Sequence, residues 1–248
     1  MEFFFESKTI SSFQDFLREV NYGSLEKDER LFVVRDLLVD SITQKLSDIK
    51  DEHSFYGFVS NIKLTSKYKT TKKVNVDFYW KFDIVKSTDD GFCNYAKCSV
   101  ETVNEFNYIC CITFNCNSNL GGFDKLDFIK RSKQFLQDRF DSYALHEIKH
   151  ALDSIDEIFI KPSTRKIANK FSSDKEKSQY VSQDTERDVY FLTVIEDLKR
   201  IKKTKPEMSL LQAMEESDFY TKFTRYIKPQ LRNKYKTKVA YFWYSNYK

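Results

Sequence analysis

The sequence has little glycine and proline and lacks a long apolar run. Its 248 residues include 5 Gly and 3 Pro, which excludes collagen-like chains and low-complexity linkers. A membrane-spanning helix needs about 18 or more consecutive apolar residues, and no such stretch occurs. The first residues, MEFFFESKTISSF, have no basic region and an apolar run of only three residues. They do not fit a secretory signal, so we expect a cytoplasmic protein without a membrane partner.

Cysteine pairs of the Cys-x-x-Cys type are also absent. The five cysteines are odd in number and lie in one short stretch, at Cys93, Cys98, Cys110, Cys111 and Cys116. Their apolar, strand-like surroundings predict reduced core thiols rather than a metal site. Phe, Tyr, Lys and Asn are frequent while Ala, Gly and Pro are rare, a bias typical of AT-rich coding in many phages, viruses and low-GC bacteria. For a phage or virus protein, the expected compartment is the host cytoplasm.

The composition that remains predicts a folded chain. Hydrophobic residues make up 41% and aromatic residues 16% of the sequence, too much for a disordered protein. A chain of this length buries most of its unfolded surface, so it needs no disulfide or metal merely to fold. We find no internal repeat and no linker, and we predict a single α+β domain over residues 1–248. Its parts are a helical amino-terminal part at 1–50, a sheet with a long helix at 54–160, and a helical part at 184–248.

Hydrophobic periodicity places the first elements. Residues 10–21 and 28–49 are predicted helices, since apolar side chains in the second recur at three- and four-residue steps. Between 54 and about 115, β-branched and aromatic residues alternate with turn residues, which predicts about four antiparallel strands. The sequence therefore indicates amino-terminal helices followed by a small antiparallel sheet.

The second half of the chain is predicted to be helical. Residues 123–157 carry a broad helical stripe that predicts one long helix, with or without a break near 140. The polar segment 161–182 is expected to be exposed, and helices are predicted at about 184–203 and 207–231. The final VAYFWYSNY is expected to be a strand or a packed tail.

Two of the three histidines lie four positions apart in His146-Glu147-Ile148-Lys149-His150, within the predicted helix. This is an H-E-x-x-H motif. Residues i and i+4 lie one turn apart on the same face of a helix, so both imidazoles can bind one ion. Glu147 lies beside that ion rather than against it, where it can take a proton from a metal-bound water.

The motif from His146 to His150 resembles the active-site helix of the zincin metallopeptidases. The resemblance implies a zincin-like fold, a bound Zn²⁺ held by His146 and His150, and peptide hydrolysis with Glu147 as the general base. It also implies that the last strand before the helix, around 106–115, is the edge strand that pairs with an extended peptide substrate.

A catalytic zinc takes three protein ligands and keeps one open position. His53 precedes the predicted sheet, and Asp156 shares the motif helix, where it points away from the ion if the helix continues. Glu186 opens a separate helix on the face that carries Val194 and Leu198, and a carboxylate on an apolar face needs a partner. We therefore favour Glu186 as the third ligand, which resembles the gluzincin pattern, with Asp156 as the alternative.

Other residues of the predicted site are less defined by the sequence. Asp153, Asp188 or Asp197 could accept a hydrogen bond from a ligand histidine. Peptide hydrolysis also needs a group that stabilises the oxyanion, and 15 tyrosines leave that choice open.

The end of the chain is basic. No acidic residue follows Asp218, so residues 219–248 carry a formal charge of +8; the whole chain has +4, which leaves −4 for the rest. Aromatic residues interleave with these cations, a pattern that can bind phosphates and stack on bases. A lysine-rich solvated face over an aromatic core gives the same pattern. The alternative function is therefore a non-enzymatic interaction or virion-type protein that binds nucleic acid or another acidic partner through 219–248.

Overall fold

The computed structural model describes residues 28–50, 55–66, 73–86, 92–118, 123–157, 173–182 and 184–247. The strands are β1 (Tyr56–Thr65), β2 (Lys73–Lys86), β3 (Cys93–Asn104) and β4 (Asn107–Ser118). The helices are α3 (Glu29–Leu46), α4 (Lys125–Asp138), α5 (Phe140–Glu157), α6 (Asp174–Val181), α7 (Asp184–Thr204), α8 (Leu210–Glu216), α9 (Asp218–Tyr226) and α10 (Pro229–Asn246). The α+β class is confirmed. The predicted helix at 10–21 and His53 lie outside the described residues.

The sheet is mixed, so the prediction of a purely antiparallel sheet is wrong. Its strand order is β1-β2-β4-β3. β1 pairs antiparallel with β2, and β3 pairs antiparallel with β4, but β2 and β4 are parallel. The reason is nonlocal: β3 and β4 form a hairpin, and β4 rather than β3 takes the position beside β2. Alternating side chains cannot distinguish these two placements, because both bury the same face.

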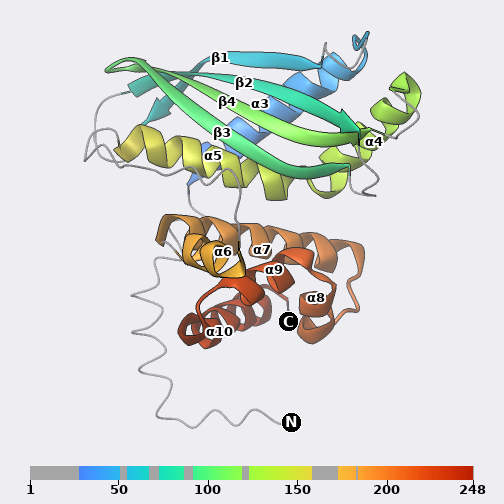
Figure 1. The fold of residues 1–248 in the computed structure, drawn as a ribbon, viewed down its shortest axis with the longest axis vertical. Coiled ribbons are helices and arrows are strands. Elements are labelled where there is room, and N and C mark those ends of the chain that lie inside the picture. Colours follow the sequence, from blue (N-terminus) through green and yellow to red (C-terminus); the bar gives the residue numbers. More distant parts are fainter. Residues whose placement is uncertain are drawn as a thin grey trace.

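The strand over 106–115, predicted to be an edge, is an interior strand. β4 has a neighbour on each side and is buried over most of its length, as expected for the near-continuous apolar run of an interior strand. The edge strand next to the motif helix is β3, which contacts α5 (Figure 1). Tyr143 of α5 donates a hydrogen bond from its hydroxyl to the carbonyl of Cys93, at 3.1 Å.

Helices cover one face of the sheet. α3, α4 and α5 lie against this face, and the opposite face is not covered by any described helix (Figure 1). Phe78, Trp80 and Phe114 are buried in the layer between sheet and helices, while Phe58 and Tyr79 are exposed on the opposite face. The motif helix α5 is thus packed against the sheet through the main hydrophobic core.

The segment 123–157 forms two helices, with the break at Arg139. The Asp124 side chain caps the start of α4, and Arg139, at φ −135°, leaves the helical region. Phe140 then begins α5 and is fully buried. The long helix is therefore interrupted near 140, which the sequence had left open, and the whole H-E-x-x-H motif lies inside α5.

The carboxyl-terminal helices pack around a second hydrophobic cluster. Its members include Val194, Leu198, Phe223 and Trp243, whereas Leu192 of α7 belongs to the first cluster. Helix α7 therefore lies between the two clusters, directly beneath α5 (Figure 1).

The predicted helix over 184–203 is confirmed, whereas the single helix expected at 207–231 is three separate helices. The Ser217 side chain caps α9, and Pro229 occupies the first turn of α10, where its missing N–H costs no hydrogen bond. The segment VAYFWYSNY lies at the end of α10. It is not a strand; it is helical and packed, with Val239, Phe242 and Trp243 buried in the second cluster.

We expect Gly57→Ala to destabilise the sheet. A Cβ at Gly57 would lie 2.7 Å from Cζ2 of Trp80, whose indole is buried and donates to Ser41 Oγ at 2.9 Å. The ring cannot move without losing this contact, so overpacking should lower the free energy of unfolding by about 1–3 kcal/mol. Urea denaturation measures it, with the exposed Ser60→Ala on the same strand as the control. Equal stability of the two variants would contradict the packing described.

Candidate metal centre

The two motif histidines converge because α5 is regular through the motif. His146 Nε2 and His150 Nε2 lie 3.1 Å apart, as expected for i and i+4 side chains on one helix face. The His150 residue is 8% exposed, and the His146 side chain is 15% exposed. Both rings therefore lie at the inner surface of α5, toward α7.

Glu186 completes the group from α7. Its Oε2 lies 3.3 Å from His150 Nε2 and 4.0 Å from His146 Nε2. The ligand atoms of His146, His150 and Glu186 all lie within 4.8 Å of one another. The structure thus brings together the three residues that the sequence selected as ligands.

The arrangement of these atoms fits a tetrahedral zinc site. Zinc bonds of about 2.0–2.1 Å imply ligand atoms about 3.3 Å apart in a tetrahedron. The distances from His150 Nε2, 3.1 and 3.3 Å, lie close to this value, and the distance of 4.0 Å between His146 Nε2 and Glu186 Oε2 is longer. Two imidazole nitrogens and one carboxylate oxygen are also a ligand set that zinc accepts with a fourth position open. The residues present therefore fit the ion that the motif implies.

Glu147 lies beside the ligands without being one of them. It is 8% exposed and follows His146 on α5. Its charge, together with that of Glu186, contributes to the raised pKa of Tyr190, after the larger effect of burial. The Tyr190 ring in turn contacts the His146 ring edge-on, with centroids 4.9 Å apart. Glu147 is therefore a buried carboxylate close to the ligand set, as a general base requires.

Glu186 is held as a carboxylate by its neighbours. Burial alone would raise its pKa, but hydrogen bonds with His150 and Tyr180 lower it below the ordinary value. The same contact raises the pKa of Tyr180, after the effect of burial. A buried anion thus faces two imidazoles, an arrangement that stabilises a bound cation.

Tyr180 is the site residue that sequence reasoning missed. It lies in α6, within the segment 161–182 that the polar composition predicts to be exposed. The helix is short, with Ser173 as its cap and Val181 as its buried residue. One apolar position in eight residues gives no periodic signal, so nothing in the sequence indicated that Tyr180 reaches Glu186.

The alternative ligand, Asp156, belongs to a different ion cluster. Its carboxylate accepts hydrogen bonds from Arg30 Nη2 at 2.9 Å and from Ser66 Oγ at 3.1 Å. Arg30 also contacts Asp28 at 2.8 Å. Burial opposes the charge of Arg30, but Asp28 and Asp156 raise its pKa above the ordinary value. This cluster joins the start of α3 to the end of α5.

The three aspartates considered as partners of the histidines have other contacts. Asp153 pairs with Lys149 one turn earlier on α5. Asp188 accepts from the Tyr235 hydroxyl at 3.0 Å, and Asp197 accepts from the Ser217 hydroxyl at 2.7 Å. The hydroxyl that lies near His146 is instead that of Thr193, with Oγ1 3.4 Å from His146 Nδ1.

The largest aromatic side chains of the basic segment 219–248 are mostly in the core. Phe223, Tyr235, Phe242 and Trp243 are buried in the second cluster, whereas Tyr241 and Tyr244 are exposed. Lysines cover the buried rings; Lys238, for example, lies 4.4 Å from the ring centre of Tyr235. Binding of nucleic acid or another acidic partner here stays a prediction, with two exposed rings in this segment rather than a continuous aromatic surface.

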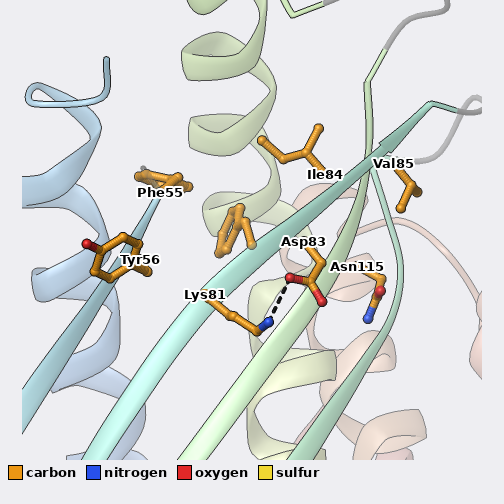
Figure 2. Close-up of a pocket in the computed structure, with 8 residues that line it drawn as sticks. Phe55, Tyr56, Lys81, Asp83, Ile84, Val85 and Asn115 are labelled. Atoms are coloured by element: carbon orange, nitrogen blue, oxygen red, sulfur yellow. Dashed lines mark ion pairs between the residues drawn. The ribbon is translucent and has the colours of Figure 1, made fainter. Parts of the chain in front are cut away.

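A separate pocket lies at one end of the sheet, away from the histidines. It has a volume of about 450 Å³ and is lined by β1, β2 and β4 residues that include Tyr56, Val85 and Asn115. Figure 2 shows Lys81 and Asp83 side by side in this pocket, joined by an ion pair of 2.9 Å. None of the predicted site residues lines it.

In comparisons with protein-family models, curated proteins and solved structures, none matches this chain. Assignment to the zincins is therefore a proposal based on the motif and on the geometry around it. Among the described residues, no helix has the length and apolar character needed to cross a membrane.

We expect Asp156→Asn to affect stability and not metal binding. It replaces a buried carboxylate that accepts charged hydrogen bonds from Arg30, so the free energy of unfolding should fall by about 1.5–3 kcal/mol. Asp153→Asn removes a helix pair with Lys149 and should cost about 0.5 kcal/mol or less. Denaturant unfolding and zinc titration of both variants give the comparison. Loss of zinc binding in Asp156→Asn alone would make Asp156 a ligand.

Proposed function

We propose that this chain is a zincin-like, zinc-dependent peptidase. The observation that supports the proposal is the convergence of His146 and His150 on α5 with Glu186 on α7, within 4.8 Å of one another. This geometry occurs at a motif whose remaining acidic residue, Glu147, is buried next to the ligand set. The three converging residues hold the ion, and Glu147 acts as the general base.

The residues divide the chemistry between them. Zinc, when bound, polarises the scissile carbonyl and lowers the pKa of the attacking water. Glu147 accepts the proton of that water and returns it to the leaving amine. Its burial keeps bulk water from its carboxylate, and in the metal-free protein Glu186 is kept ionised because His150 and Tyr180 hydrogen-bond to it.

The substrate in this proposal is a peptide or protein segment bound in an extended conformation. β3 is the sheet edge beside α5, and an edge strand can pair with an extended chain through its free backbone groups. The strand at 106–115 cannot serve this purpose, because β4 is already paired on both sides. The peptide would therefore run along β3.

A non-enzymatic, metal-stabilised protein is the competing proposal. It is favoured by one observation: the ligands come from α5, in the first hydrophobic cluster, and from α7, which borders the second. An ion held between these helices would join the two clusters even without catalysis. The two proposals differ in the role of Glu147, which is needed for hydrolysis but not for binding the ion.

We expect Glu147→Gln to abolish hydrolysis while keeping the metal. Removing the general base should lower the rate by about 10²–10⁴-fold, measured on a mixture of quenched-fluorescent peptides with the zinc-loaded protein. Zinc content should stay at one ion per chain, because Glu147 is not among the converging ligand atoms. His150→Ala is the comparison that should lose both zinc and hydrolysis.

Two results would contradict these roles. Loss of zinc in Glu147→Gln would make Glu147 a ligand. Hydrolysis at the wild-type rate in Glu147→Gln would show that this residue is not the base. If the wild-type protein binds one zinc and cleaves no peptide in the mixture, the metal-stabilised protein is the better description.

We also expect zinc to raise the melting temperature, because its ligands come from two helices that separate on unfolding. At a free zinc concentration 100 times the dissociation constant, the stabilisation should be about 2.7 kcal/mol. Glu186→Ala should remove most of this shift and keep the fold. Glu196→Ala changes the same residue type on α7, at a position paired with Lys199, and should keep the shift. An equal zinc shift in Glu186→Ala and wild type would remove Glu186 from the site.

A further inference from the structure

Three side chains on one face of α7 lie next to the ring of His146. Glu186, Tyr190 and Thr193 are spaced by four and three residues, so they lie on the same face of the helix. Glu186 Oε2 lies 4.0 Å from His146 Nε2, the Tyr190 ring contacts the imidazole, and Thr193 Oγ1 lies 3.4 Å from Nδ1. Thr193 is 2% exposed, so water does not compete for its hydroxyl.

The hydrogen-bond inventory of Thr193 determines which atom donates. Its hydroxyl has one hydrogen and two lone pairs. The carbonyl of Val189 lies 3.1 Å from Oγ1 and that of Ser142 lies 3.4 Å away, and carbonyls can only accept. Both contacts have Oγ1 as the donor. When the single hydrogen is donated to one of these carbonyls, Oγ1 offers a lone pair to His146 Nδ1, and Nδ1 carries the proton.

The tautomer with a proton on Nδ1 leaves Nε2 of His146 with its lone pair. This is the atom that faces Glu186 Oε2 and His150 Nε2. The opposite tautomer would place a proton on Nε2, where a metal has to bind, and would set two lone pairs against each other at Thr193. The contact from α7 thus selects the form of His146 that binds metal.

We propose that Thr193 is a positioning residue of the metal centre. Its buried hydroxyl accepts a hydrogen bond from the Nδ1–H of His146 and so fixes the tautomer and ring orientation in which Nε2 binds zinc. The proposal deepens the proposed function and depends on it for the identity of the ion. Partners of this kind typically change metal affinity by about 10–100-fold when they are removed.

The first test is zinc affinity, measured by competition with a chromophoric chelator. Thr193→Val keeps the volume and removes the acceptor, so affinity should fall by about 10–100-fold. Thr193→Ser keeps the hydroxyl and should restore the wild-type affinity. Thr204→Val is the matched control, because this exposed α7 threonine donates its hydroxyl to carbonyls of its own helix, those of Arg200 and Ile201. Wild-type affinity in Thr193→Val would overturn the proposal.

The second test needs no metal. With three histidines in the chain, a long-range ¹H–¹⁵N correlation spectrum of the metal-free protein can assign each imidazole tautomer. His146 should carry its proton on Nδ1 in the wild type and in Thr193→Ser, and should lose this preference in Thr193→Val. The same tautomer in Thr193→Val and wild type would overturn the proposal. If the wild type binds no zinc but the tautomer changes as expected, the proposed function fails and the role of Thr193 stands.

Discussion

The contact between α5 and α7 is the constraint on which the rest of this structure depends. Apolar side chains of α5, such as Ala144 and Ile148, lie in the sheet cluster, and α7 contributes Leu192 to it. Val194 and Leu198 of α7 belong to the second cluster. Between these two apolar regions lie two imidazoles and the carboxylate of Glu186, nearly excluded from water. Burying such groups is costly unless they are paired or bind an ion, so the interface is stable only if its polar centre is satisfied.

The contacts around this polar centre give both Glu186 and His146 partners. Glu186 is bonded to His150 and Tyr180, and His146 is contacted by Thr193 and Tyr190. Most of these partners come from α6 and α7, while the histidines and Glu147 come from α5. An ion in the middle would therefore be held by the two histidines from the sheet half of the molecule and by Glu186 from the helical half. Mutations at either side of the interface should affect the same centre, because neither half contains a complete ligand set.

The sequence predicts interactions between residues that are close along the chain better than interactions between distant ones. The convergence of His146 and His150 depends on helical spacing alone, and Glu186 was identifiable because a carboxylate on an apolar helix face requires a partner. The partner of Asp156 was not identifiable, since Arg30 lies 126 positions away. The insertion of β4 between β2 and β3 was equally hidden, because pairing order leaves the alternation of side chains unchanged. This nonlocal step decides that β3, not β4, is the sheet edge next to the motif helix.

The basic end of the chain is connected to the same interface. Lys199 and Lys202 of α7 lie over the rings of Phe242 and Trp243, at 5.6 and 5.2 Å, so these cations cover a core that α10 shares with α7. Tyr235 of α10 donates to Asp188, two residues beyond Glu186, and burial lowers the pKa of the neighbouring Lys238 to about 8. Helix α10 therefore fixes the turn of α7 that carries Glu186. The end of the chain therefore has a structural role, because α10 keeps the carboxylate of Glu186 opposite the two histidines.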